Sequence, residues 1–164
     1  MSAVNPIFID FEASSLDLIT SYPIEVAICM PEGETHSWLI KPHVLWKDWS
    51  GKAAKIHGIT REELEKDGEN CRDVAQALNE ILGDAIVYCD AWTFDSFWLH
   101  RLFKGSQLKH SFQIESISVL LDDAQVSNWQ TAHNAVITDL DLVRHRAAHD
   151  AKILHETYKR LTQA

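Results

Sequence analysis

Residues 6–12 read Pro-Ile-Phe-Ile-Asp-Phe-Glu, and they decide how the rest of the chain is interpreted. The run 6–11 is mostly apolar, β-branched and aromatic, which predicts a strand buried on both faces. Asp10 and Glu12 are two residues apart, so the period of a strand points both side chains to the same face. Two such carboxylates repel each other and lose hydration, and a cation between them is the ordinary remedy. The stretch therefore predicts a core strand that ends in a cation site.

A hairpin and then a series of helices follow this strand. Apolar runs at 23–30 and 35–41 flank the turn signal Pro-Glu-Gly-Glu at 31–34, which predicts two further strands. From residue 52 the apolar residues recur with a helical period, and the run 85–88 returns to strand composition. We expect the main helices over 71–82, 94–103, 115–123 and 150–161. Three strands followed by strands that alternate with helices indicate an α/β sandwich.

Length and composition indicate one domain over residues 1–164, with 46% hydrophobic and 24% charged residues. No apolar run approaches the roughly 18 residues that span a bilayer, and no secretory signal is recognised, so we expect a cytoplasmic protein without a membrane partner. Three cysteines without a CxxC pair argue against a disulfide framework and a zinc site. The net charge of -9 disfavours a passive nucleic-acid coat, but an acidic site filled with divalent cations escapes that objection.

Two more acids begin helices. Asp95 opens the predicted aromatic helix that follows a strand, and Asp150 opens the last helix. Taken singly, each is explained as an N-terminal cap or a first-turn acid that interacts with the helix dipole. The conjunction of Asp10, Glu12 and these two acids with His145, five residues before Asp150, favours one shared site.

Three segments carry a specific resemblance. FIDFEASSL (8–16), TFDSFWL (93–99) and HRAAHDA (145–151) resemble, in order and spacing, the three motifs of the DnaQ-like, or DEDDh, 3′–5′ exonucleases. The segments 22–28 and 56–60 are similar to connecting segments of that family. The resemblance implies a ribonuclease H-like fold, a five-stranded mixed sheet with helices on both faces and an antiparallel second strand, which agrees with the predicted hairpin.

The resemblance also implies a site. Its metal ligands would be Asp10, Glu12, Asp95 and Asp150, and these would hold two divalent cations, Mg²⁺ or Mn²⁺, which prefer oxygen ligands. His145 would be the general base, because neutral imidazole accepts a proton near physiological pH. His149 is a competing candidate, and His145 is preferred because its five-residue step to Asp150 matches the family.

The implied activity is release of nucleoside 5′-monophosphates from the 3′ end of single-stranded or short RNA or DNA, with the choice between RNA and DNA open. Candidate substrate contacts follow the first motif and surround the second: Ala13, Leu16, Trp92 and Phe94. Core packing competes with this role for Leu16 and Phe94, and a structural role is favoured for His57. A homodimer is compatible with the family. The alternative function is a nuclease-fold binding subunit that docks a polymerase or another partner.

Overall fold

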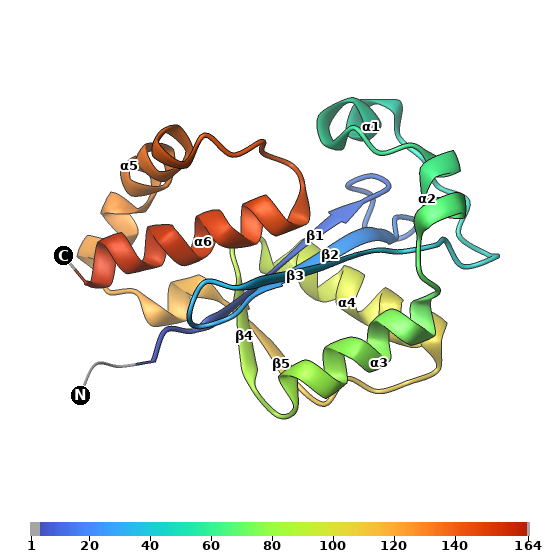
Figure 1. Cartoon of the computed structure of the whole chain (residues 1–164), viewed down its shortest axis with the longest axis horizontal. Coiled ribbons are helices and arrows are strands. Elements are labelled where there is room, and N and C mark those ends of the chain that lie inside the picture. The colour runs from blue at the N-terminus through green and yellow to red at the C-terminus, as the bar shows by residue number, and fades with distance from the viewer. Residues whose placement is uncertain (1–3, 164) are drawn as a thin grey trace.

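The computed structural model describes residues 4–163, and its centre is one mixed β-sheet (Figure 1). The strands are β1 (Ile7–Ala13), β2 (Pro23–Cys29), β3 (Thr35–Leu39), β4 (Ile86–Cys89) and β5 (Gln113–Ser116). They lie in the order β3-β2-β1-β4-β5. The pairs β1–β2 and β2–β3 are antiparallel, whereas β1–β4 and β4–β5 are parallel. The expected five-stranded mixed sheet with an antiparallel second strand is therefore confirmed.

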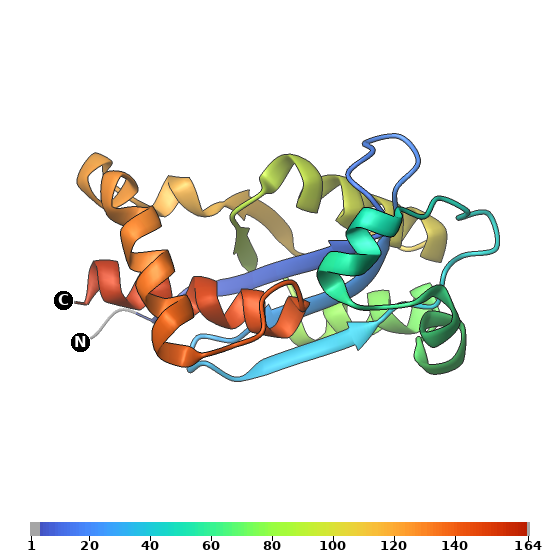
Figure 2. The same cartoon turned by 90° about the horizontal axis from the view of Figure 1, so that it is seen from above.

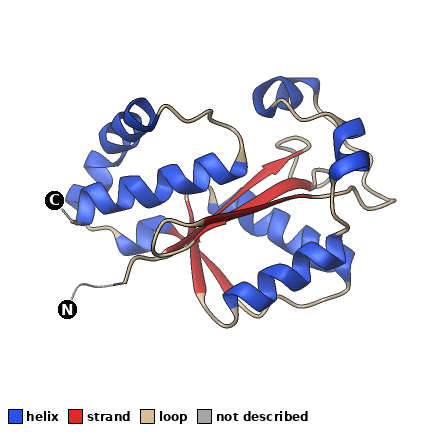
Figure 3. Ribbon diagram, in the orientation of Figure 1, coloured by secondary structure: helices blue, strands red, loops and turns tan. Residues whose placement is uncertain are grey.

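Helices cover both faces of this sheet, as expected (Figure 3). They are α1 (Gly51–His57), α2 (Arg61–Asp67), α3 (Cys71–Leu82), α4 (Trp92–Ser106), α5 (Asp123–Leu140) and α6 (Ala147–Thr162), with a 3₁₀ turn at Ile117–Leu120. The helices α3 and α4 pack on one face, α6 packs on the other, and α5 packs against α6 (Figure 2). No helix within residues 4–163 is long and apolar enough to cross a membrane.

Successive side chains of β1 point to opposite faces of the sheet, and this alternation explains where Asp10 and Glu12 lie. Ile9 and Phe11 are buried in the larger core with α3 and α4, whereas Phe8 is buried in the smaller core with Ala151 and Leu154 of α6. A period of two therefore directs Asp10 and Glu12 toward the face that α6 covers. The strand thus carries its carboxylates toward the N-terminal end of α6.

The region after α4 corrects the sequence prediction. Residues 115–123 do not form a helix: β5 takes 113–116, the 3₁₀ turn follows, and α5 begins only at Asp123. The strand is short and polar, with alternately exposed and half-buried residues, so only its pairing with β4 defines it. Along α5 only Val136 is fully buried, which leaves a weak apolar period in the sequence.

The predicted end of the helix at residues 94–103 was also wrong. Gly105 does not stop this helix but lies inside it, and α4 continues to Ser106. A Cβ atom at position 105 would lie 2.9 Å from the ring of Trp46. The glycine therefore serves the close packing of helix and indole rather than a helix end.

Candidate active site

Three elements bring the four predicted acids together. Asp10 and Glu12 lie near the end of β1, Asp95 lies in the first turn of α4, and Asp150 lies in the first turn of α6. One ligand atom each of Glu12, Asp150 and His145 lie within 4.8 Å of one another. One carboxylate oxygen each of Asp10, Asp95 and Asp90 form a second group within the same limit. Residues separated by as many as 140 positions thus form one acidic centre, because Asp10 and Glu12 of β1 join the two groups.

Burial makes the ionised form of these carboxylates unfavourable unless a cation is bound. Asp10 is 9% exposed and Asp95 is 2% exposed, and the Oδ2 atom of each is buried without a hydrogen-bond partner in residues 4–163. Burial, reinforced by the neighbouring carboxylates, raises the pKa of Asp10 well above its usual value, and burial with Asp90 does the same for Asp95. Burial and the adjacent Asp150 raise the pKa of Glu12 to about 9. These residues fit a divalent cation, since they offer unpartnered hard oxygen ligands whose repulsion it would remove.

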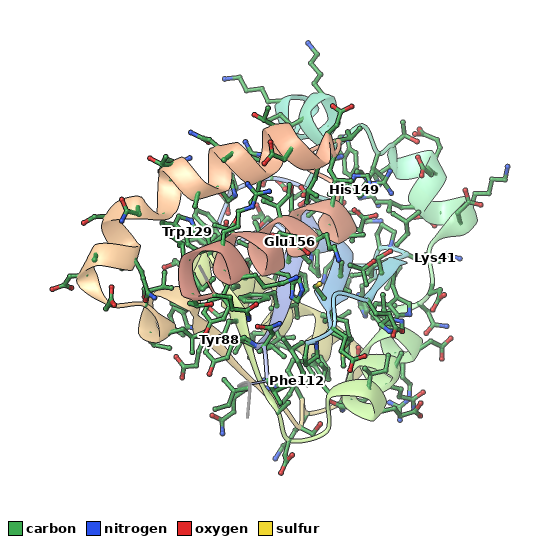
Figure 4. The ribbon with its side chains drawn as sticks, turned by 60° about the vertical axis from the view of Figure 1, so that its left-hand side comes forward. Lys41, Tyr88, Phe112, Trp129, His149 and Glu156 are labelled. Carbon is green, nitrogen blue, oxygen red and sulfur yellow. The ribbon has the colours of Figure 1, made fainter. Side chains whose placement is uncertain are left out.

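The segment before α6 fixes His145 beside these acids. Its backbone has a φ of 67°, the left-handed conformation that non-glycine residues seldom adopt. The backbone N–H of His145 donates to the carboxylate of Asp150 at 3.1 Å (Oδ2) and 3.2 Å (Oδ1). His149, labelled in Figure 4, belongs to the first turn of α6. It is engaged elsewhere, because its Nδ1 lies 2.7 Å from the carbonyl oxygen of Val143. The geometry thus places His145, and not His149, in the group with Glu12.

The carboxylate of Glu25, on β2, holds this segment in place. Glu25 is buried, lies opposite Glu12 in the β1–β2 register, and accepts the backbone N–H of Ala147 at 2.8 Å. It also binds Arg146 in a bidentate pair, with Nη2 to Oε2 at 2.7 Å and Nε to Oε1 at 3.1 Å. Sequence reasoning did not place Glu25 in the site. The available signal was an acid inside the otherwise apolar run 23–30, which needs a buried partner.

An apolar cavity of about 240 Å³ adjoins the acids. Its lining comes from β1, the loop after it, α1, α4 and the segment before α6, namely Phe11, Glu12, Ala13, Ser15, Leu16, Ala53, Ile56, His57, Trp98 and His145. Ala13 and Leu16, two of the predicted substrate contacts, are among these residues. Trp92 and Phe94 are not: Trp92 donates its Nε1–H to the carbonyl of Ile114, and Phe94 packs against Trp98.

His57 is a polar residue in this apolar lining. The sequence analysis favoured a structural role for it. Its Nδ1 accepts the backbone N–H of Ile59 at 3.0 Å, so the ring proton of the neutral imidazole is on Nε2. Burial lowers the pKa of His57 and thereby favours this neutral form. The Nε2 atom is buried and has no partner in residues 4–163. The Nε2–H of His57 is therefore a buried donor with no partner among these residues.

Asp90 is a further acid of the centre that the sequence did not mark as a ligand. It follows β4 directly and is exposed, with a carboxylate oxygen near those of Asp10 and Asp95. Its negative charge contributes to the raised pKa of Asp95. The parallel pairing of β1 and β4 was the missing information, because its register places the end of β4 beside the middle of β1, where Asp10 lies.

The comparisons with known proteins agree with this fold. Residues 7–158 match the profile of the RNase T family, described as exonuclease, and the chain therefore belongs to this exonuclease family. The relationship expected from the three motifs is confirmed. No curated protein sequence shows a significant match.

Solved structures of exonuclease I resemble the chain in fold. A zinc-bound complex of E. coli exonuclease I with single-stranded DNA has a TM-score of 0.70 at 16% identity, with 99% of this chain and 42% of that chain covered. E. coli exonuclease I with a dA16 oligonucleotide gives a TM-score of 0.70 at 14% identity, covering 98% of this chain and 42% of that one. The moderately thermophilic exonuclease I from Methylocaldum szegediense gives 0.70 at 15% identity, covering 98% and 40%. The chain thus spans about two fifths of these structures.

Proposed function

We propose that the chain is a metal-dependent 3′–5′ exonuclease that releases nucleoside 5′-monophosphates from single-stranded or short RNA or DNA. The observation that carries the proposal is the convergence of Asp10, Glu12, Asp95 and Asp150 with His145, beside an apolar cavity that Glu12 and His145 line. Membership of the exonuclease family supports the reaction class. Residues 1–164 would constitute one exonuclease domain.

The acids have a defined part in this reaction. Asp10, Glu12, Asp95 and Asp150 would hold two divalent cations, Mg²⁺ or Mn²⁺. When bound, such ions neutralise the phosphate charge and stabilise the attacking and leaving oxygens of an in-line displacement. The unpartnered Oδ2 atoms of Asp10 and Asp95 support this assignment, since each requires a partner that the protein does not provide.

His145 accepts the proton of the attacking water in this proposal. Its ring lies in one group with Glu12 and Asp150, next to the expected position of the terminal phosphodiester. Asp150 fixes the main chain of His145 through the bonds to its N–H, and Glu25 fixes the two residues that follow. The leaving group is the 3′-oxygen of the shortened strand, and the released nucleotide retains the phosphate on its 5′-oxygen.

The cavity receives the terminal nucleoside. Apolar atoms of Phe11, Leu16 and Ile56 cover a base or sugar, while Glu12 and His145 supply polar groups of the lining. Such a mixture of apolar lining and few polar groups is typical of ligand sites. Several of the E. coli exonuclease I structures contain single-stranded DNA, which supports a single-stranded substrate for this chain as well.

End-labelled oligonucleotides test the function. With Mg²⁺ or Mn²⁺, a 5′-labelled DNA or RNA strand of about 12 nucleotides should shorten stepwise from its 3′ end and release 5′-monophosphates, and EDTA should stop the reaction. Asp10→Asn should be inactive, whereas Asp84→Asn, which neutralises an exposed acid in the turn before β4, should retain full activity. Binding of the strand without hydrolysis in either metal would support the alternative, a binding subunit.

A further inference from the structure

Three hollows adjoin one another along the C-terminal half of α4, outside the acidic centre. Their volumes are about 540, 470 and 380 Å³. Lys104 lines the first and second hollows, and His43 and Gly105 line the second and third, so the three form one surface depression, here called the basic groove. The groove contains five of the chain's 15 lysine and arginine residues: Lys41, Arg72, Arg101, Lys104 and Lys109.

These cations have no acidic partners. No aspartate or glutamate lines any of the three hollows, although the chain has a net charge of -9. None of the five forms an ion pair with another described residue. Arg72 donates only to the carbonyl oxygen of Ser106, and the Nε atom of Arg101 is buried without a partner in residues 4–163. Clustered cations that repel one another favour binding of an anion.

The floor of the groove is rigid. Trp46 is 5% exposed and stacks on Tyr22 with ring centroids 5.3 Å apart. The guanidinium carbon of Arg101 lies 5.5 Å from the centroid of the Trp46 ring, a cation–π contact that restrains this cation. Gly105 allows the indole to lie against the helix, since any side chain at this position would collide with it. The groove thus presents cations on a packed surface.

The position of the groove connects it with the acidic centre. Trp98 lines the apolar cavity, and Arg101, about one helical turn further along α4, lines the groove. At 1.5 Å per residue, Arg101 and Lys104 lie about 9 and 14 Å along the helix from Asp95. This separation corresponds to a few nucleotides of a single strand whose 3′ end lies in the cavity.

We propose that the basic groove binds the phosphate backbone of the single strand on the 5′ side of the terminal nucleotide. The proposal rests on the proposed exonuclease function, since that function puts the 3′ end in the cavity. Phosphate contacts of this kind hold the strand without reading its sequence. They explain how an acidic protein retains a polyanion: the repulsive carboxylates are gathered at the cation site, and the free cations lie along the strand.

Salt-dependent binding tests the groove separately from hydrolysis. Lys104 and Lys109 are exposed, so the double variant Lys104→Gln with Lys109→Gln should fold normally. Binding of labelled dT12 and U12 is measured in EDTA over about 50–300 mM salt. The slope of log K against log salt should fall by about 1.4, at about 0.7 for each lost contact with a single strand. At about 0.1 M salt, this corresponds to about 25-fold weaker binding relative to the limit near 1 M.

A matched control and a short substrate complete the design. The variant Lys159→Gln with Arg160→Gln removes two charges from α6, on the opposite face of the sheet, and should bind like the wild type. The p-nitrophenyl ester of thymidine 5′-monophosphate, which is too short to reach the groove, should be hydrolysed at the wild-type rate by both variants. Unchanged affinity and slope in the Lys104 and Lys109 variant would overturn the groove proposal, whereas a wild-type protein that binds dT12 but hydrolyses neither substrate would overturn the proposed function instead.

Discussion

Replacing Glu25 by glutamine should weaken both the fold and the turnover, because this carboxylate holds the segment that carries His145. The variant loses the charge that binds Arg146, but its amide oxygen still accepts the N–H of Ala147. Glu25 is 4% exposed, and removing one partner of a fully buried ion pair costs about 3–5 kcal/mol. The Arg146 side chain is 39% exposed and regains water, so the loss should resemble that of a charged hydrogen bond, about 1.5–3 kcal/mol.

Urea unfolding measures the loss in the free energy of unfolding, and steady-state kinetics measure the loss in turnover. In thermal unfolding, the same loss of stability should lower the unfolding temperature of a domain of this size by about 3–12 °C. A misplaced base reduces turnover more than substrate affinity, so kcat should fall roughly 10- to 100-fold with a smaller change in KM. Glu34→Gln is the control, because it makes the same change in the exposed β2–β3 turn and should stay within about 0.5 kcal/mol.

Two results would refute the reasoning about Glu25. A variant as stable as the wild type would show that its buried pair with Arg146 contributes nothing to the fold. A destabilised variant with unchanged kcat would show that the pair supports α6 without positioning His145.

Three more predictions concern the acidic centre. Asp150→Asn should abolish hydrolysis while changing the unfolding temperature little, because asparagine still accepts the His145 N–H but carries no charge; substantial hydrolysis would exclude Asp150 as a ligand. His145→Ala should lose about 10²–10⁴ in kcat, measured on a short oligonucleotide, and full activity would leave His145 as no more than a substrate contact. Without metal, the raised pKa of Glu12, about 9, means that the folded state retains a proton that the unfolded state releases, so stability should fall as pH rises from about 4.5 toward 9. Thermal unfolding at about pH 6 and pH 8.5 should show this fall in EDTA and a larger stabilisation by Mn²⁺ at the higher pH, and both effects should diminish in Glu12→Gln.

The sequence was most informative where local pattern and tertiary role coincide. The strand 6–11 and the hairpin could be predicted because their apolar runs and turn residues are explicit. Asp10 and Glu12 could be assigned to one face from the strand period alone, and the structure places both on the side of α6. The three motifs then led to the exonuclease family and to residues that meet in one centre.

The remaining features depend on contacts between distant segments. β5 has too little apolar surface to be recognised before it pairs with β4. Asp90 becomes part of the centre only through the parallel β1–β4 pair, and Glu25 only because Arg146 lies opposite it. The tautomer of His57 depends on the hydrogen bond that its Nδ1 accepts from the Ile59 N–H. None of these relations is encoded in a local period or spacing.

The metal content of the site tests the account most directly. Mn²⁺ titrations followed by electron paramagnetic resonance, in the presence of a nucleoside 5′-monophosphate, should show two ions bound to each wild-type chain. Asp10→Asn should lose bound Mn²⁺ while remaining folded, because Asp10 belongs to one group of ligands and also interacts with Glu12 and Asp150 of the other. A wild-type chain that binds no Mn²⁺, or an Asp10→Asn variant that binds it as well as the wild type, would contradict the assignment of these carboxylates as the metal site.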